Sequence, residues 1–180
     1  MSADKVRKLL VSLQDDPESA KAWSALEEMA LDGGLAALGA EFAEQLAAER
    51  RRFLTRGECE AAAKLLDIEA MIAASPEARA ALLRERAFVL EEELLDDRGA
   101  VATLESLLSQ GADAEAASEH ARLVAKKGKW KDLVGDFRRR AENDTTDPTV
   151  IASLLVSAAA LVLQYKNKLK DRDVDSIFEE

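Results

Sequence analysis

Apolar side chains recur along this chain at the spacing of one face of a helix. In the first segment Val6, Leu10 and Leu13 lie four and three residues apart, with mostly polar residues between them. This period predicts an amphipathic helix that ends near Asp15. No stretch shows the alternation of apolar and polar residues that is typical of a strand. The pattern therefore predicts an all-helical chain of nine or ten helices joined by short loops.

Prolines and glycines give the expected ends of these helices. Each of the three prolines, Pro17, Pro76 and Pro148, follows Asp or Ser. This order places an N-cap residue before a proline at the first helical position, where the missing N–H costs nothing. Glycines that follow an apolar stripe predict helix ends. The expected helices cover 1–15, 16–32, 35–56, 59–74, 75–97, 98–109, 113–127, 128–141, 148–165 and 173–180.

The segment 128–141 carries a compact apolar stripe. Its members at helical spacing are Trp130, Leu133, Val134 and Phe137. That face has to be buried against another helix. Because the preceding helix, 113–127, is bounded by Gly111 and Gly128, we expect the two helices to fold back on each other as an antiparallel hairpin with Phe137 as its buried anchor.

Composition narrows the class of protein. The 180 residues are 48% hydrophobic, 33% charged and only 4% aromatic, which is typical of closely packed helices in a soluble protein. The net charge of -10 disfavours a general attraction to nucleic acid or anionic lipid. A single cysteine, Cys59, excludes an internal disulfide, and no secretory signal opens the chain, so we expect a cytoplasmic protein. The longest nearly uncharged run, 150–165, is short for a membrane span and is interpreted as a buried helix.

Three of the expected hairpins share a repeat. When their second helices are aligned, Leu104, Phe137 and Phe178 occupy the same position, separated by 33 and 41 residues. Small or apolar residues stand four positions earlier, and an apolar or aromatic residue of the first helix stands 13 positions earlier in the last two hairpins. These residues are Ala100, Leu133, Val174, Val124 and Tyr165. A period of about 34 residues is that of a tetratricopeptide array. Residues 75–180 resemble that family, whereas residues 1–74 support helical hairpins without fixing a family.

The resemblance implies a right-handed α-solenoid of stacked antiparallel hairpins that forms a single domain, 1–180. The chain ends soon after its last anchor, so we expect either the amino-terminal part of a longer array or a short final helix that frays in isolation. The resemblance also implies a non-enzymatic scaffold or adaptor that binds a partner protein or peptide in a bacterial-type cytoplasm. One alternative is a structural spacer or self-association module of a larger protein. Another is a helical regulatory or catalytic domain, which would need a cofactor.

Residues that could support catalysis are few. The chain has one histidine and one cysteine, with no HExxH, no paired CxxC and no glycine-rich loop between a strand and a helix. The usual parts of metal, thiol and phosphate sites are therefore missing, and we expect no enzyme activity, no cofactor and no metal. His120 is interpreted as a hydrogen-bonded core histidine, and Cys59 as a small buried hydrophobe.

One stretch is basic in this acidic chain. Residues 121–141 include eight lysines and arginines and two aspartates, a net charge of +6. These charges either complement helix ends and the acidic run 91–97, or form a docking patch for an acidic peptide. Nucleic acid is a third option, weakened by the overall negative charge.

The tetratricopeptide register implies where a partner would bind. The implied partner-binding residues are Ser118, Arg122, Lys126 and Lys166. Those on the first helix should point away from a buried stripe of Ala117, Ala121 and Val124, since residues four apart project to nearly the same side. The expected partner is an acidic or C-terminal peptide whose binding weakens with salt.

Overall fold

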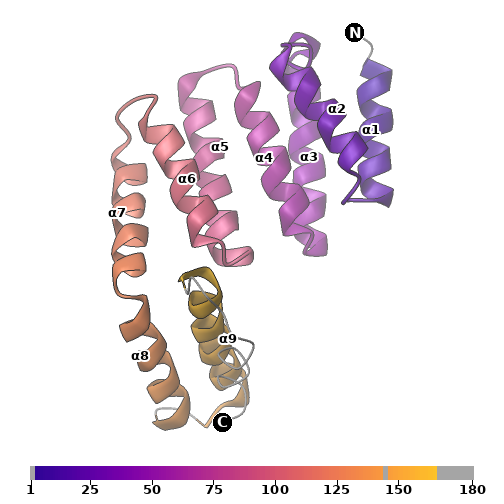
Figure 1. Ribbon diagram of the computed structural model, residues 1–180. Helices are drawn as coiled ribbons and strands as arrows, with labels where there is room; N and C mark the ends of the chain where they lie inside the picture. Colours follow the sequence, from indigo (N-terminus) through magenta and orange to yellow (C-terminus); the bar gives the residue numbers. More distant parts are fainter. Residues whose placement is uncertain (1–2, 144–145, 166–180) are drawn as a thin grey trace.

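The computed structural model of the protein describes residues 3–143 and 146–165. Over these residues the chain forms nine α-helices and no strand (Figure 1), which confirms the all-helical prediction. The helices are α1 (Ala3–Asp15), α2 (Ala20–Leu31), α3 (Ala40–Arg56), α4 (Cys59–Met71), α5 (Pro76–Phe88), α6 (Asp97–Leu108), α7 (Ala114–Gly128), α8 (Trp130–Asn143) and α9 (Pro148–Tyr165), with a 3-10 turn η1 (Ala36–Leu38) and a π-helical turn η2 (Val89–Glu93). The expected tenth helix, 173–180, lies outside the described residues.

The start of α2 differs from the expectation. Pro17 does not occupy the first turn of a helix, because α2 begins only at Ala20. Residues before it form a separate turn, in which the Asp16 carboxylate accepts a hydrogen bond from the Glu18 N–H at 3.2 Å. The indole N–H of Trp23 donates to the Pro17 carbonyl at 2.8 Å. Because Trp23 is buried, this bond both satisfies its N–H and holds the turn against the helix.

The expected third helix is divided by a glycine. Gly39 has a φ of 79°, so η1 ends before it and α3 begins after it. The far end of α3 is as expected, with Gly57 in the left-handed conformation at a φ of 75°. The Gly57 N–H bonds to the Leu54 carbonyl at 3.1 Å, and the Glu58 N–H bonds to the Phe53 carbonyl at 2.9 Å. These two bonds form a Schellman motif, which satisfies the last carbonyls of the helix.

Two helix starts that the prolines predict are confirmed. Helix α5 begins at Pro76, and the Ser75 hydroxyl accepts a hydrogen bond from the Ala78 N–H at 3.2 Å. Helix α9 begins at Pro148, and the carboxylate of the preceding aspartate accepts from the Thr149 N–H at 2.9 Å. A side-chain oxygen placed before proline therefore fixes both boundaries locally.

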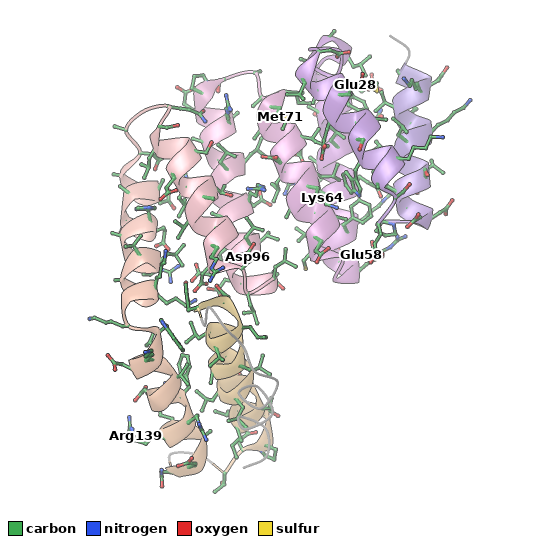
Figure 2. All side chains as sticks on the ribbon, viewed as in Figure 1. Glu28, Glu58, Lys64, Met71, Asp96 and Arg139 are labelled. Carbon is green, nitrogen blue, oxygen red and sulfur yellow. The ribbon has the colours of Figure 1, made fainter. Side chains whose placement is uncertain are left out.

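From α3 to α7 each helix packs on the next one along the chain, with side chains filling the space between neighbouring ribbons (Figure 2). Figure 1 shows these helices as a row, with α1 and α2 at one end. The buried residues form two main hydrophobic clusters, and α4 contributes to both of them. Its Leu65 and Ile68 belong to the first cluster, while Ala63 and Leu66 belong to the second. The buried helix α4 thus joins the amino-terminal helices to the centre of the protein.

The expected hairpin of α7 and α8 is not formed. In Figure 1 α8 continues beyond the end of α7 instead of turning back beside it, and α8 packs antiparallel to α9. Gly128 does not adopt the left-handed conformation that ends α3 at Gly57. The backbone N–H of Lys129 still bonds to the Ala125 carbonyl at 3.2 Å, so the chain passes from one helix to the next without a reversal. The apolar face of α8 is instead covered by α9.

The register of α7 also differs from the expectation. Ala117, Ala121 and Val124 are exposed rather than buried. The buried residues of this helix are Ala116 and Leu123, which pack in the second cluster. The buried face is therefore displaced by one residue from the predicted one.

Helix α9 is less buried than its composition suggested. Over the described residues it is the one helix long and apolar enough to cross a membrane by length and composition, with a mean hydropathy of 1.7. Only 22% of it is buried. Ala158, Ala159 and Val162 pack against Trp130, Val134 and Phe137 of α8 in a small third cluster. The interpretation of 150–165 as a buried helix is therefore wrong for most of its length.

Candidate functional site

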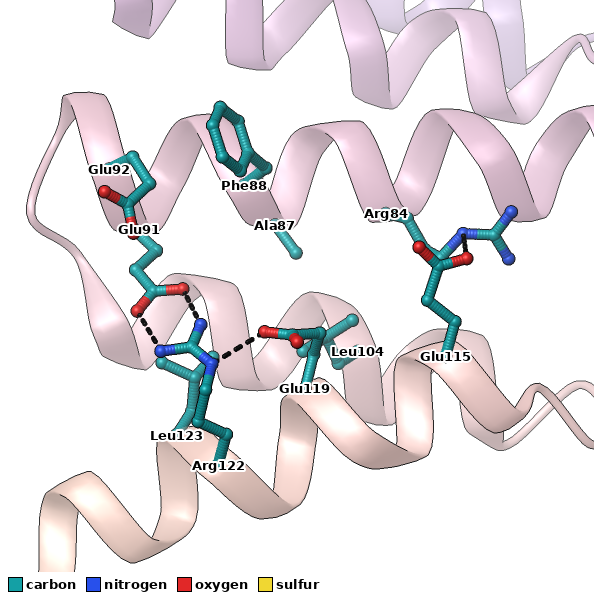
Figure 3. A pocket seen from close by; sticks show the side chains of 10 residues that line it. All are labelled: Arg84, Ala87, Phe88, Glu91, Glu92, Leu104, Glu115, Glu119, Arg122 and Leu123. Carbon is teal, nitrogen blue, oxygen red and sulfur yellow. Dashed lines mark hydrogen bonds and ion pairs between the residues drawn. The ribbon is translucent and has the colours of Figure 1, made fainter.

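A cleft lies between α5 and α7, with α6 behind it (Figure 3). Its volume is about 330 Å³. The lining residues are Arg84, Ala87, Phe88, Glu91, Glu92, Leu104, Glu115, Glu119, Arg122 and Leu123. The cleft combines an apolar floor with charged residues on both of its long sides, and it contains Arg122, one of the residues that the sequence predicted for partner binding.

A wide turn at the end of α5 shapes one end of the cleft. The expected continuous helix 75–97 gives way to the π-helical turn η2, in which the Leu94 N–H bonds to the Val89 carbonyl five residues back at 3.2 Å. The next residue, Leu95, has a φ of 52°, the one positive value among the described non-glycine residues. Single π-turns and strained residues of this kind occur frequently at functional sites. Here they place Glu91 and Glu92 at the cleft.

Glu91 and Arg122 bridge the cleft from opposite sides. The guanidinium of Arg122 donates to both carboxylate oxygens of Glu91, and the bond from its NH1 to Oε1 is 2.8 Å long (Figure 3). The Nε of Arg122 donates to Glu119 at 2.8 Å. Burial alone would raise the pKa of Glu91, which is only 7% exposed, but the hydrogen bonds and charges of Arg122 and Lys126 together lower it. Glu91 is thus held as a carboxylate by its partners.

A second buried carboxylate lies behind the first. Asp97 is fully buried at the start of α6, and it accepts hydrogen bonds from Lys126 Nζ and from the Tyr165 hydroxyl, each at 2.8 Å. Lys126 Nζ also lies 3.5 Å from Glu91 Oε1. Burial, followed by the hydrogen bond to Asp97 and its charge, raises the pKa of Tyr165 well above its usual range. The phenol therefore stays protonated and donates to Asp97.

Gln164 attaches the end of α9 to the same region. Its side-chain oxygen accepts from the Asp97 N–H at 2.9 Å, and its side-chain nitrogen donates to the Leu95 carbonyl. These bonds span 67 and 69 residues of sequence. The strained backbone at Leu95 is thereby held by a side chain from the far end of the chain.

Arg84 occupies the other end of the cleft. It bonds to Asp113 and lies 3.1 Å from Glu115. Asp113 also caps α7 by accepting from the Ala116 N–H at 2.9 Å. That backbone hydrogen bond and the charge of Arg84 lower the pKa of Asp113. Both arginines of the cleft are therefore held by carboxylates of the same chain.

The structure brings together two of the four predicted partner-binding residues. Arg122 and Lys126 meet at Glu91, whereas Ser118 is exposed and does not line the cleft. Lys166 lies outside the described residues. The contacts of Arg122 and Lys126 match the first interpretation of the basic stretch, in which its cations complement the acidic run 91–97. An acidic partner at these residues stays a prediction.

Two other residues considered from the sequence are half-buried. His120 Nε2 lies 3.3 Å from Glu105 Oε1 at the edge of the protein, so it is not a core histidine. Cys59 is a free thiol whose pKa is raised by burial and by the charge of Glu93. Within the described residues no cluster of three or more His, Cys, Asp or Glu could hold a metal ion.

Phe88, Glu92 and Asp97 were missed as members of a site. One sequence signal did point to the region, because acidic residues at the end of a helix are electrostatically unfavourable unless something compensates them.

Comparison with protein-family models, with curated proteins and with solved structures finds no match to this chain. Its function has to be inferred from the cleft itself.

Proposed function

We propose that this chain is a non-enzymatic scaffold that binds a segment of another protein in the cleft between α5 and α7. The observation that carries the proposal is Phe88, whose side chain is 61% exposed on α5 and lines the cleft. A large aromatic side chain left in water gains free energy when a partner covers it, and such residues are frequent anchors of interfaces. In Figure 3 Phe88 projects from α5 at the rim of the cleft, while Ala87 points from the same helix toward Leu104 and Leu123.

The charged residues of the cleft support a binding role. Arg122 is held by Glu91 and Glu119, and Arg84 is held by Asp113 and Glu115. Paired groups of this kind fix the walls of the cleft before a partner arrives, which reduces the entropy that binding has to overcome. They are less suited to proton transfer, which needs a group poised to change its charge.

The arrangement of the helices supports the same class of function. The packing of each helix on the next from α3 to α7 is compatible with a right-handed tetratricopeptide-like solenoid over this part of the chain, and the proposal includes that architecture. Solenoids of this type use extended concave surfaces for binding.

A display library of random peptides tests the proposal without a known partner. Peptides selected on the full chain should bind the Phe88→Ala variant at least about tenfold more weakly, about 1.4 kcal/mol, because the variant loses the aromatic wall of the cleft. Affinities are measured by fluorescence anisotropy. The control is Leu31→Ala, which removes a still more exposed apolar side chain at the end of α2. Selected peptides that bind Phe88→Ala as tightly as the unaltered chain would place the binding surface elsewhere.

Self-association is a second candidate function, and α9 favours it. Val156 and Leu163 are 49% and 54% exposed on a helix without a charged residue, so two copies would not repel each other there. If this face is self-associating, sedimentation velocity should show dimers that form with rising concentration, and Val156→Glu should return the protein to a monomer. Val11→Glu, at an exposed position of α1, is the control. A monomer at every concentration would rule out this function.

A further inference from the structure

The cleft carries more carboxylates than cations. It adjoins a second cleft of about 340 Å³ at the first turns of α5, and the two clefts, which share Arg84, are together termed the groove. The charged residues that line the two clefts are Arg84, Arg122, Glu77, Glu91, Glu92, Asp113, Glu115 and Glu119. Six carboxylates face two guanidinium groups, a net charge of -4. The lining is therefore acidic, even when Lys126, whose ammonium lies 3.5 Å from Glu91, is counted with it.

The two arginines are already engaged. The side chain of Arg122 is 48% exposed, so an acidic segment could approach it, but that segment would also meet the charges of Glu91, Glu92 and Glu119. Displacing Glu91 would be costly as well, because it would leave a buried carboxylate with fewer partners. The groove therefore disfavours the acidic peptide that the sequence predicted.

A positively charged segment could approach carboxylates that are exposed to solvent. Glu92 is exposed, and the side chains of Glu115 and Glu119 are 73% and 47% exposed, so a cation can approach all three from solvent. Such contacts add to the existing ion pairs without breaking any of them. The apolar floor lies between α5 and the carboxylates of α7, and Phe88 lies at the rim on α5.

We infer that the partner is a basic protein segment, in which an apolar side chain packs on Phe88 between lysines or arginines that face Glu92 and Glu115. This inference rests on the proposed function, because it names the partner of the same cleft. Complementary charge raises the rate of association and selects against acidic competitors. Nucleic acids and anionic membranes carry the wrong sign for this groove.

Three fluorescein-labelled peptides of equal length and equal apolar content provide the probe, with their charged positions all lysine, all glutamate or all glutamine. The lysine peptide should bind the full chain at least about tenfold more tightly than the glutamate peptide, and added salt should weaken its binding. Binding should depend on Phe88, so the Phe88→Ala variant is measured alongside.

Charge-reversal variants test which carboxylates attract the lysine peptide. The double variant Glu92→Lys with Glu115→Lys should lower the affinity for the lysine peptide at least about tenfold. Glu93→Lys is matched in charge to the single reversal Glu92→Lys, which is measured alongside, since Glu93 is exposed beside Glu92 but does not line either cleft. It should change the affinity less than about twofold.

The outcomes distinguish an error in the inferred charge of the partner from an error in the proposed binding function. If the glutamate peptide binds best and needs Phe88, the cleft is a binding site and the inferred sign of the partner is wrong. If Glu93→Lys weakens binding as much as the double variant, the attraction comes from the whole protein and the inference also fails. If no peptide binds in a manner that depends on Phe88, both the inference and the proposed function are overturned.

Discussion

Replacing Arg50 with methionine should destabilise the protein by about 3–5 kcal/mol. Arg50 is 9% exposed on α3, and its Nε donates to Glu69 of α4 at 2.8 Å. Its NH2 lies 3.4 Å from the second oxygen of Glu69, and its NH1 bonds to Glu85 of α5. The substitution leaves Glu69, itself 6% exposed, as a buried carboxylate without the cation that hydrogen-bonds to it. The cation that links α3 to both α4 and α5 is then missing.

Urea denaturation followed by circular dichroism measures this loss. The control is Arg51→Met on the same helix, where an exposed arginine should change the free energy of unfolding by less than about 0.5 kcal/mol. Burial already raises the pKa of Glu69 in spite of Arg50. Removing Arg50 raises that pKa further, so the folded variant binds a proton more readily than the unfolded chain, and its deficit narrows as the pH falls. Equal stability of Arg50→Met and Arg51→Met would contradict the assigned burial of this pair.

Phe53→Ala should cost about 3–5 kcal/mol, because Phe53 is the largest fully buried side chain of the described residues and its removal leaves a cavity in the first cluster. The same substitution at the exposed Phe88 should stay within about 0.5 kcal/mol. Phe137, which the sequence predicted as a buried anchor, is only half-buried against α9. The free energy of unfolding lost by Phe137→Ala should therefore lie between the losses of the other two variants. Unfolding midpoints of the three variants give the comparison. A Phe53→Ala loss no larger than that of Phe88→Ala would show that Phe53 is not in the core.

Much of the fold followed from local signals. The start of α5 at Pro76, the start of α9 at Pro148 and the end of α3 at Gly57 each depend on residues within a few positions of the boundary. Local chemistry of this kind is visible in a sequence. It fixes where a helix begins or ends, but it does not determine which helix lies beside it.

The error in α7 shows why the facing of a helix is harder to predict. Ala117, Ala121 and Val124 follow the same period as Ala116, His120 and Leu123, displaced by one residue. Alanine gives little contrast between the two faces, so the periodicity alone could not choose between them. The fold buries the side that holds the larger aliphatic residue, Leu123, and leaves His120 at the edge beside Glu105.

The long-range polar contacts of the protein could not be predicted for a different reason. The acceptors of Arg50 lie 19 and 35 residues away along the chain. The partners of Asp97 and Leu95 on α9 are more distant still. Their identity depends on tertiary packing, which no local pattern encodes.

The shared position of Lys126 links the cleft to the last helix in a thermodynamic sense. Its ammonium lies 2.8 Å from Asp97 and 3.5 Å from Glu91, so the two carboxylates share one cation. Glu91 lines the cleft and Asp97 receives the hydroxyl of Tyr165 from α9, so a change in charge at Glu91 alters the field at the contact with α9. Any free-energy coupling of this kind is reciprocal, and a change at Asp97 would alter the cleft by the same amount.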